Sequence, residues 1–126
     1  MSIFGAANPA RIAALELGEI PTAKFAAVRT VMDSMGEAFA RQWADNARET
    51  AGEHGKHYPD SITADRIVSL GGIAVDVGPD KSRRQGGMGL GFEFGSQNQP
   101  PHLDGLRAQD AIAPRIERAI DVAMGF

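Results

Sequence analysis

The chain contains no cysteine, which removes disulfide bonds, thiolate metal ligands and cysteine nucleophiles from its chemistry. It also lacks an excess of positive charge: 13 lysines and arginines stand against 16 acids, and the formal net charge is -3 at pH 7. A nucleic-acid contact would therefore need a local basic patch. No apolar run approaches the ~20 residues of a membrane span, and the first residues lack the pattern of a secretory signal. We expect a protein that is soluble and intracellular when made, without membrane contact.

The length of 126 residues suits a single domain, residues 1–126, with one small core. Within residues 1–21, the alanine content slightly favours a short helix over an edge strand. From Thr22 to about Ala51 there is no proline, and Gly52 marks the expected end. Apolar residues recur there at alternating three- and four-residue steps: Phe25, Val28, Met32, Met35 and Phe39. This spacing predicts one long amphipathic helix.

Residues 62–77 alternate between apolar and polar positions on both sides of the pair Gly71-Gly72. Glycine supplies the positive φ that tight hairpin turns need, so the pattern predicts two antiparallel strands. The glycine-rich range 78–91 follows and reads as a long, exposed, mobile loop. Its cations Lys81, Arg83 and Arg84 indicate either a solvated loop tip or a contact with DNA or an acidic partner surface.

The stretch from Gly87 to His102 carries neither glycine pattern of a phosphate-binding loop, and no helix signal follows it. Phe92 and Phe94 stand two residues apart, which in a strand places both on one face and Glu93 on the other. A strand that covers the core is favoured over a base-stacking strand of the RNA-recognition kind. The pair His54 and His57 with Asp60 is expected to be a polar turn, so we predict neither a metal site nor a cofactor site.

The C-terminal part combines helix signals with prolines. Pro100-Pro101 enforces an extended backbone, and Asp104 is expected to cap the helix that follows. Pro114 is expected to kink or restart that helix. An apolar stripe then leads to Gly125: Ile116, Ile120, Ala123 and Met124. The predicted class is α+β, with a long N-terminal helix, a small mostly antiparallel sheet of three or four strands, and a C-terminal helix packed on the sheet.

The segment "GFEFGSQNQPPH" followed by "LRAQDA" resembles the small tail-completion proteins of long-tailed bacteriophages, the putative tail-component family. That family carries a pattern like G-[YF]-x-x-E-[FY]-G-[TS], a short polar gap, P-[AP]-[HR]-P-F-[LM]-R-P-A and a final helix. The chain departs at 103–105, where Leu-Asp-Gly replaces the Pro-Phe of the pattern. The resemblance spans about residues 25–126, and its matching residues are Gly91, Phe92, Glu93, Phe94, Gly95, Ser96, Pro100, Pro101, His102, Leu106, Arg107 and Ala108.

This resemblance implies a structural protein and not an enzyme. Proteins of the family form rings, commonly hexameric, at the head-to-tail neck or the top of the tail. Each ring completes the tail and joins it to the head connector, while DNA passes through the lumen without specific binding. The expected partners are other copies of the chain and other phage neck and tail-tube proteins, and the expected location is the virion neck after assembly in the host cytoplasm. The expected assembly contacts are Lys81, Arg83, Arg84, Glu93 and Arg107.

Two alternatives stay open at this point. The first is a small nucleic-acid-binding module that uses the basic loop at 81–84 and the Phe92 and Phe94 strand. The second is a small enzyme without a recognisable motif, in which the fold would gather acids and histidines that no sequence pattern organises. Its candidate side chains are His57, Asp60, Glu93 and His102.

Overall fold

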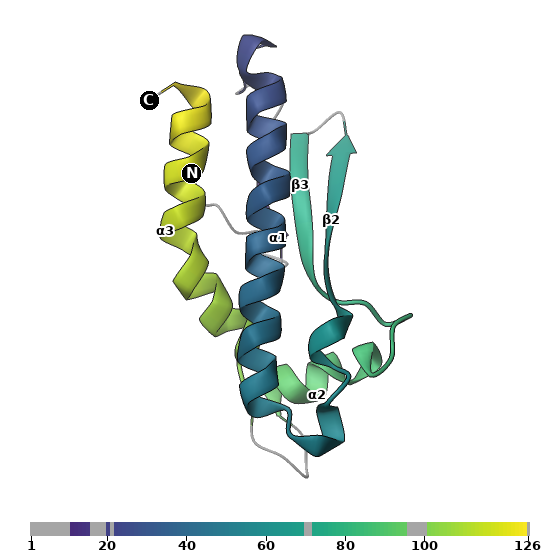
Figure 1. The fold of residues 1–126 in the computed structure, drawn as a ribbon. Helices are drawn as coiled ribbons and strands as arrows, with labels where there is room; N and C mark the ends of the chain where they lie inside the picture. Colours follow the sequence, from purple (N-terminus) through teal and green to yellow (C-terminus); the bar gives the residue numbers. More distant parts are fainter. Residues whose placement is uncertain (1–10, 16–19, 21, 70–71, 96–100, 126) are drawn as a thin grey trace.

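The computed structural model describes residues 11–15, 20, 22–69, 72–95 and 101–125. Its main elements are the strand β1 (Arg11–Leu15), the helix α1 (Phe25–Thr50), the strands β2 (Ile62–Ser69) and β3 (Gly72–Pro79), the short helix α2 (Gly89–Phe94) and the helix α3 (Asp104–Met124). Figure 1 shows α1 between α3 on one side and the β2–β3 hairpin on the other. The α+β class is confirmed. No helix among the described residues is both long and apolar enough to cross a membrane.

Helix α1 confirms the expected long helix. A 3-10 turn, Thr22–Lys24, leads into it, and Gly52 follows its end with a left-handed φ of 63°. The apolar stripe faces inward, and Val28, Met32 and Phe39 are almost fully buried. Gly36 sits inside the helix because a Cβ there would lie 2.6 Å from Cγ1 of Val75. The missing side chain lets the helix approach the sheet closely, which accounts for a residue that weakens helices.

The hairpin of β2 and β3 is also confirmed, with Gly71 outside the described residues. Val75 and Val77 are buried against the core. Residues 11–15 form a strand, so the slight preference for a helix there was wrong. This strand, β1, pairs with the free edge of β3, and its register shifts between Ile12 and Leu15. The sheet is thus the β2–β3 hairpin extended by the short β1, in the order β1-β3-β2 and antiparallel throughout.

Helix α3 corrects the predicted packing of the C-terminal helix. Its main contacts are with α1 and not with the sheet, because α1 covers the hairpin first. Ile112, Ile116 and Ile120, spaced four residues apart, are buried in the common core. Pro114 lies inside α3 and does not restart it, and Figure 1 shows α3 bent. The helix ends at Gly125, which adopts a left-handed φ of 90°.

The range 78–91 is not the single long loop that the sequence predicted. Strand β3 continues to Pro79, hydrogen-bonded turns occupy residues 80–85, and a 3-10 turn, Gly86–Met88, leads into α2. The predicted strand at Phe92 and Phe94 was also wrong, because residues 89–94 are helical. In a helix, positions two apart point to different sides, so Phe92 is 2% exposed and Phe94 is 61% exposed.

Candidate assembly site

The N-terminus of α3 is held by an acid from another helix. Glu93 of α2 is buried, and its two carboxylate oxygens accept hydrogen bonds from the backbone N–H groups of Gly105 (2.8 Å) and Leu106 (3.0 Å). The first N–H groups of a helix have no partner within the helix and attract negative charge. Glu93 therefore caps α3 from a distance of 12 residues in sequence, which periodicity alone could not reveal.

Asp104 does not play the capping role that the sequence predicted. Leu103, with a left-handed φ of 54°, stands at the cap position, and no side-chain cap bond is present there. The fully buried carboxylate of Asp104 instead accepts hydrogen bonds from the Thr50 hydroxyl (2.8 and 2.9 Å) and from Nη2 of Arg107 (2.7 Å). These bonds tie the start of α3 to the end of α1. We name Thr50, Glu93, Asp104 and Arg107 the α3 lock.

The main chain and a second side chain reinforce the α3 lock. The carbonyls of Phe92 and Glu93 accept hydrogen bonds from the N–H groups of His102 (2.8 Å) and Leu103 (3.0 Å). The amide of Asn46, which is buried, donates to the carbonyl of Asp104 at 3.0 Å. The last carbonyls of α2, which have no partner within that helix, are thus satisfied by the chain that enters α3.

Aromatic rings pack beside the α3 lock. Phe92 lies between Tyr58, with ring centroids 4.6 Å apart, and His102, with ring centroids 5.6 Å apart in a stacked arrangement. A Cβ on Gly105 would come within 2.6 to 2.8 Å of three atoms of the Trp43 indole. The absence of a side chain at Gly105 therefore allows Trp43 to lie directly against the first turn of α3.

Three buried polar atoms in this region have no hydrogen-bond partner: Nε1 of Trp43, the hydroxyl of Tyr58 and Nδ1 of His102. Burial raises the pKa of Tyr58 to about 12; the nearby indole N–H of Trp43 opposes this rise, and the carboxylates of Glu93 and Asp104 add to it. The indole N–H lies near the hydroxyl without reaching hydrogen-bond geometry. Nδ1 of His102 lies 3.9 Å from Oδ2 of Asp104. Tyr58 consequently stays protonated at neutral pH.

The predicted cations lie together in a turn after β3, and we name Lys81, Arg83 and Arg84 the basic turn. Asp80 shapes this turn: its carboxylate accepts bonds from the hydroxyl (2.6 Å) and the N–H (2.9 Å) of Ser82, and these two bonds lower its pKa. Arg83 is partly engaged, with Nη1 3.3 Å from the carbonyl of Asp60. Lys81 and Arg84 are exposed. The five predicted assembly contacts therefore lie in two places. Lys81, Arg83 and Arg84 form the basic turn, whereas Glu93 and Arg107 belong to the α3 lock.

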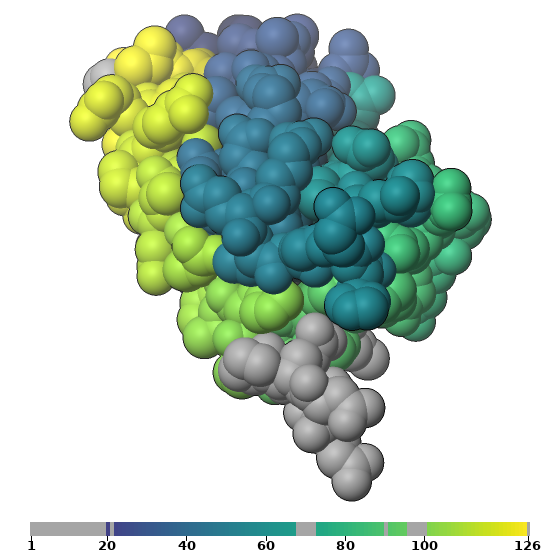
Figure 2. Space-filling view, turned by 60° about the horizontal axis from the view of Figure 1, so that its bottom comes forward, coloured from purple at the N-terminus to yellow at the C-terminus, as the bar shows by residue number. Residues whose placement is uncertain are grey.

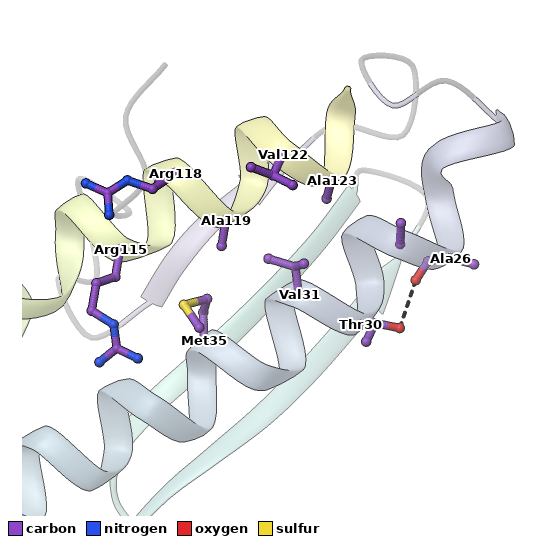
Figure 3. A pocket seen from close by; sticks show the side chains of 10 residues that line it. Ala26, Thr30, Val31, Met35, Arg115, Arg118, Ala119, Val122 and Ala123 are labelled. Carbon is purple, nitrogen blue, oxygen red and sulfur yellow. Dashed lines mark hydrogen bonds between the residues drawn. The ribbon is translucent and has the colours of Figure 1, made fainter. Parts of the chain in front are cut away.

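A groove that the sequence analysis missed runs along the outer side of α1 and α3. We name it the helix groove; its open volume is about 770 Å³. Figure 3 shows Val31 and Met35 of α1 reaching toward Ala119 of α3, with Arg115 and Arg118 along the α3 side. Val122 is 69% exposed at this surface. The sequence did carry a signal for this surface: Arg115, Arg118 and Val122 follow one another at three- and four-residue steps, which places them on one face of a helix. The lining residues are Ala26, Ala27, Thr30, Val31, Met35, Arg115, Arg118, Ala119, Val122 and Ala123.

The helix groove and the basic turn are separate surfaces. Figure 2 shows α3 (yellow) and the chain that follows β3 (green) at opposite margins of the molecule, with α1 (blue) between them. A partner that covers one of these surfaces therefore leaves the other open.

The predicted polar turn at His54 and His57 has a structural explanation. The side chain of Gln85 accepts from the N–H of His57 at 2.7 Å and donates to the carbonyl of His54 at 2.8 Å. Asp60 lies 3.4 Å from Arg48. Within the described part of the chain, no group of three or more histidines and acids could hold a metal ion.

Comparisons with protein-family models, curated proteins and solved structures find no match to this chain.

Proposed function

We propose that this chain is a structural virion protein of a phage or prophage that assembles into a ring at the head-to-tail neck or the top of the tail. The ring, a hexamer in this proposal, completes the tail and joins it to the head connector. It acts through shape and charge complementarity, without bond chemistry and without a cofactor. Its partners are other copies of the chain and other neck and tail-tube proteins.

The observation that carries this proposal is the helix groove. Small and aliphatic side chains line it, and Val122 stands largely in solvent at its edge. Other large apolar side chains are also exposed, among them Phe94 at 61% and Leu106 at 46%. An exposed apolar groove is typical of a chain that contacts other proteins. A ring subunit has such surfaces on at least two sides.

The family resemblance adds to this argument. The residues that match the family pattern meet in one place: Phe92 and Glu93 contact the chain at His102, Leu103 and the first turn of α3. Gly95, the last described residue of the first motif, has a left-handed φ of 83° and ends α2. The motif thus determines where α3 starts and how α3 lies beside α1. In the proposed ring, the motif sets the shape of the helix groove.

The acidic charge of the chain suits a DNA conduit, since a weakly repulsive wall lets a duplex slide. In this proposal the exposed Lys81 and Arg84 of the basic turn meet acidic groups of a neighbouring ring. The rival function is a nucleic-acid-binding module in which these cations and the exposed Phe94 contact DNA. Salt-sensitive binding of DNA by the free chain would favour that rival.

The test is the mass of the purified protein over a wide concentration range, measured by light scattering coupled to size exclusion, with negative-stain imaging of the fractions. We expect a concentration-dependent ring with a central hole wide enough for duplex DNA. The same measurements with purified tail tubes test whether the ring forms on a template. A chain that stays monomeric in both experiments would overturn the proposed function.

A further inference from the structure

The helix α3 carries opposite charges on two of its sides. Arg115 and Arg118 border the helix groove. A second exposed stripe runs along another side of the same helix at steps of four, four, three and four residues. We name it the acidic flank, and it consists of Leu106, Asp110, Pro114, Glu117 and Asp121.

Within the part of the chain that the structure describes, these charges form no ion pairs. Among the described residues, the ion pairs involve neither the two groove arginines nor Asp110, Glu117 and Asp121. All five side chains are exposed. Their charge is therefore available to a partner.

From this arrangement we infer that the helix groove of one copy receives the acidic flank of α3 from a second copy. This inference rests on the proposed ring and identifies the surfaces that join its subunits. Leu106 and Pro114 of the acidic flank would cover the alanines and Val31 of the groove. The carboxylates of Glu117 and Asp121 would reach Arg115 and Arg118 of the neighbouring chain.

The spacing of the charges fits this pairing. At a rise of about 1.5 Å per residue, Arg115 and Arg118 are separated by about 4.5 Å along the helix axis, and Glu117 and Asp121 by about 6 Å. Each pair spans about one helical turn, so two helices packed side by side can bring both acids to both arginines. Partial burial in an interface strengthens such pairs relative to exposed ones.

The same charges exclude the simplest alternative. A symmetric dimer that joined groove to groove would place the arginines of both chains against each other, and like charges in an interface cost affinity. A contact between two different surfaces is instead a head-to-tail contact. Head-to-tail contacts close into a ring when the rotation between neighbouring copies divides a full turn, and otherwise they form an open helical filament.

Charge reversal tests the inference. We expect the variant Arg115→Glu with Arg118→Glu, and the variant Glu117→Arg with Asp121→Arg, each to raise the concentration needed for half-assembly at least about 100-fold. The variant that combines all four changes restores opposite charges across the interface, and we expect it to assemble within about tenfold of the unchanged chain. The control for the first variant is Arg29→Glu with Lys56→Glu, which makes the same charge change at exposed positions outside the groove; it should assemble like the unchanged chain.

Light scattering gives the mass, and circular dichroism with urea unfolding establishes that each variant is folded. The glutamine versions of the same positions, with a smaller expected loss, replace any reversed variant that does not fold.

If the unchanged chain forms rings and the two reversed variants form them equally well, the interface is wrong and the proposed function stands. If the variant that combines all four changes is folded but remains monomeric, the proposed interface is also wrong. The reversed variants could instead form normal rings but no longer join tails. That result would mean that another protein, and not a second copy of the chain, occupies the groove. An unchanged chain that never assembles, alone or with tail tubes, overturns the proposed function itself.

Discussion

The two halves of α3 differ in how their polar groups are used. At its start, the buried carboxylates of Asp104 and of Glu93 from α2 accept hydrogen bonds from groups of the same chain. The missing side chain at Gly105 lets Trp43 pack directly against this first turn. Toward its end, Arg115 and Arg118 are exposed beside an open apolar groove. The first half serves the fold, while the second leaves surface for another molecule. Changes in the α3 lock and at Gly105 should therefore alter stability, and changes at the helix groove should alter assembly.

The largest expected effect tests the folded half. Replacing Asp104 by alanine removes the carboxylate that accepts hydrogen bonds from Arg107 and from the Thr50 hydroxyl. We expect the free energy of unfolding to fall by about 2–4 kcal/mol, because the variant loses hydrogen bonds to a charged group that contribute roughly 1.5–3 kcal/mol each. Urea unfolding measures this loss. The control is Asp110→Ala, at an exposed acid of the same helix, for which about 0.5 kcal/mol or less is expected. Equal losses at the two positions would contradict the special role of the α3 lock.

A second substitution tests the close packing in that half. In Gly105→Ala, the added Cβ collides with the Trp43 indole, so either the helix or the ring must shift. We expect a loss of about 1–3 kcal/mol in urea unfolding and a change in the tryptophan fluorescence, since the chain has a single tryptophan. The control is Gly87→Ala, where nothing lies within 4 Å of the new methyl group. An unchanged spectrum with full stability would show that Trp43 does not pack tightly against α3.

The third prediction concerns the ionisation of Tyr58, which packs on Phe92 beside the α3 lock. Burial raises its pKa from 10.0 to about 12 in the folded chain. A group whose folded pKa is raised contributes its stability fully below the unfolded pKa, and this contribution is lost as the pH rises from about 10 through 12. Since Tyr58 is the only tyrosine, its ultraviolet absorbance reports its ionisation directly. We expect a midpoint near 12 for the folded chain and near 10 in urea, and a folded midpoint near 10 would contradict the burial of the hydroxyl.

The smallest expected effect on stability tests the open half. Val122→Gln replaces an exposed apolar side chain at the helix groove, and we expect the free energy of unfolding to change by no more than about 0.5 kcal/mol. If the groove is an assembly surface, the same variant should form rings only at higher concentration in light scattering. A variant that unfolds more easily but assembles normally would reverse the comparison between the halves of α3.

The sequence determined the elements whose signals are local. The apolar spacing of 25–39, the glycine pair at 71–72 and the stripe at 116–124 placed α1, the hairpin and the end of α3, because side-chain periodicity follows directly from backbone geometry. Only the tertiary structure decided the rest. Residues 89–94 form a helix whose last carbonyls bond to residues 102–103, and α3 packs on α1 instead of on the sheet. Glu93 caps α3 and Arg115 borders a groove through contacts between segments distant in sequence, which no local pattern encodes.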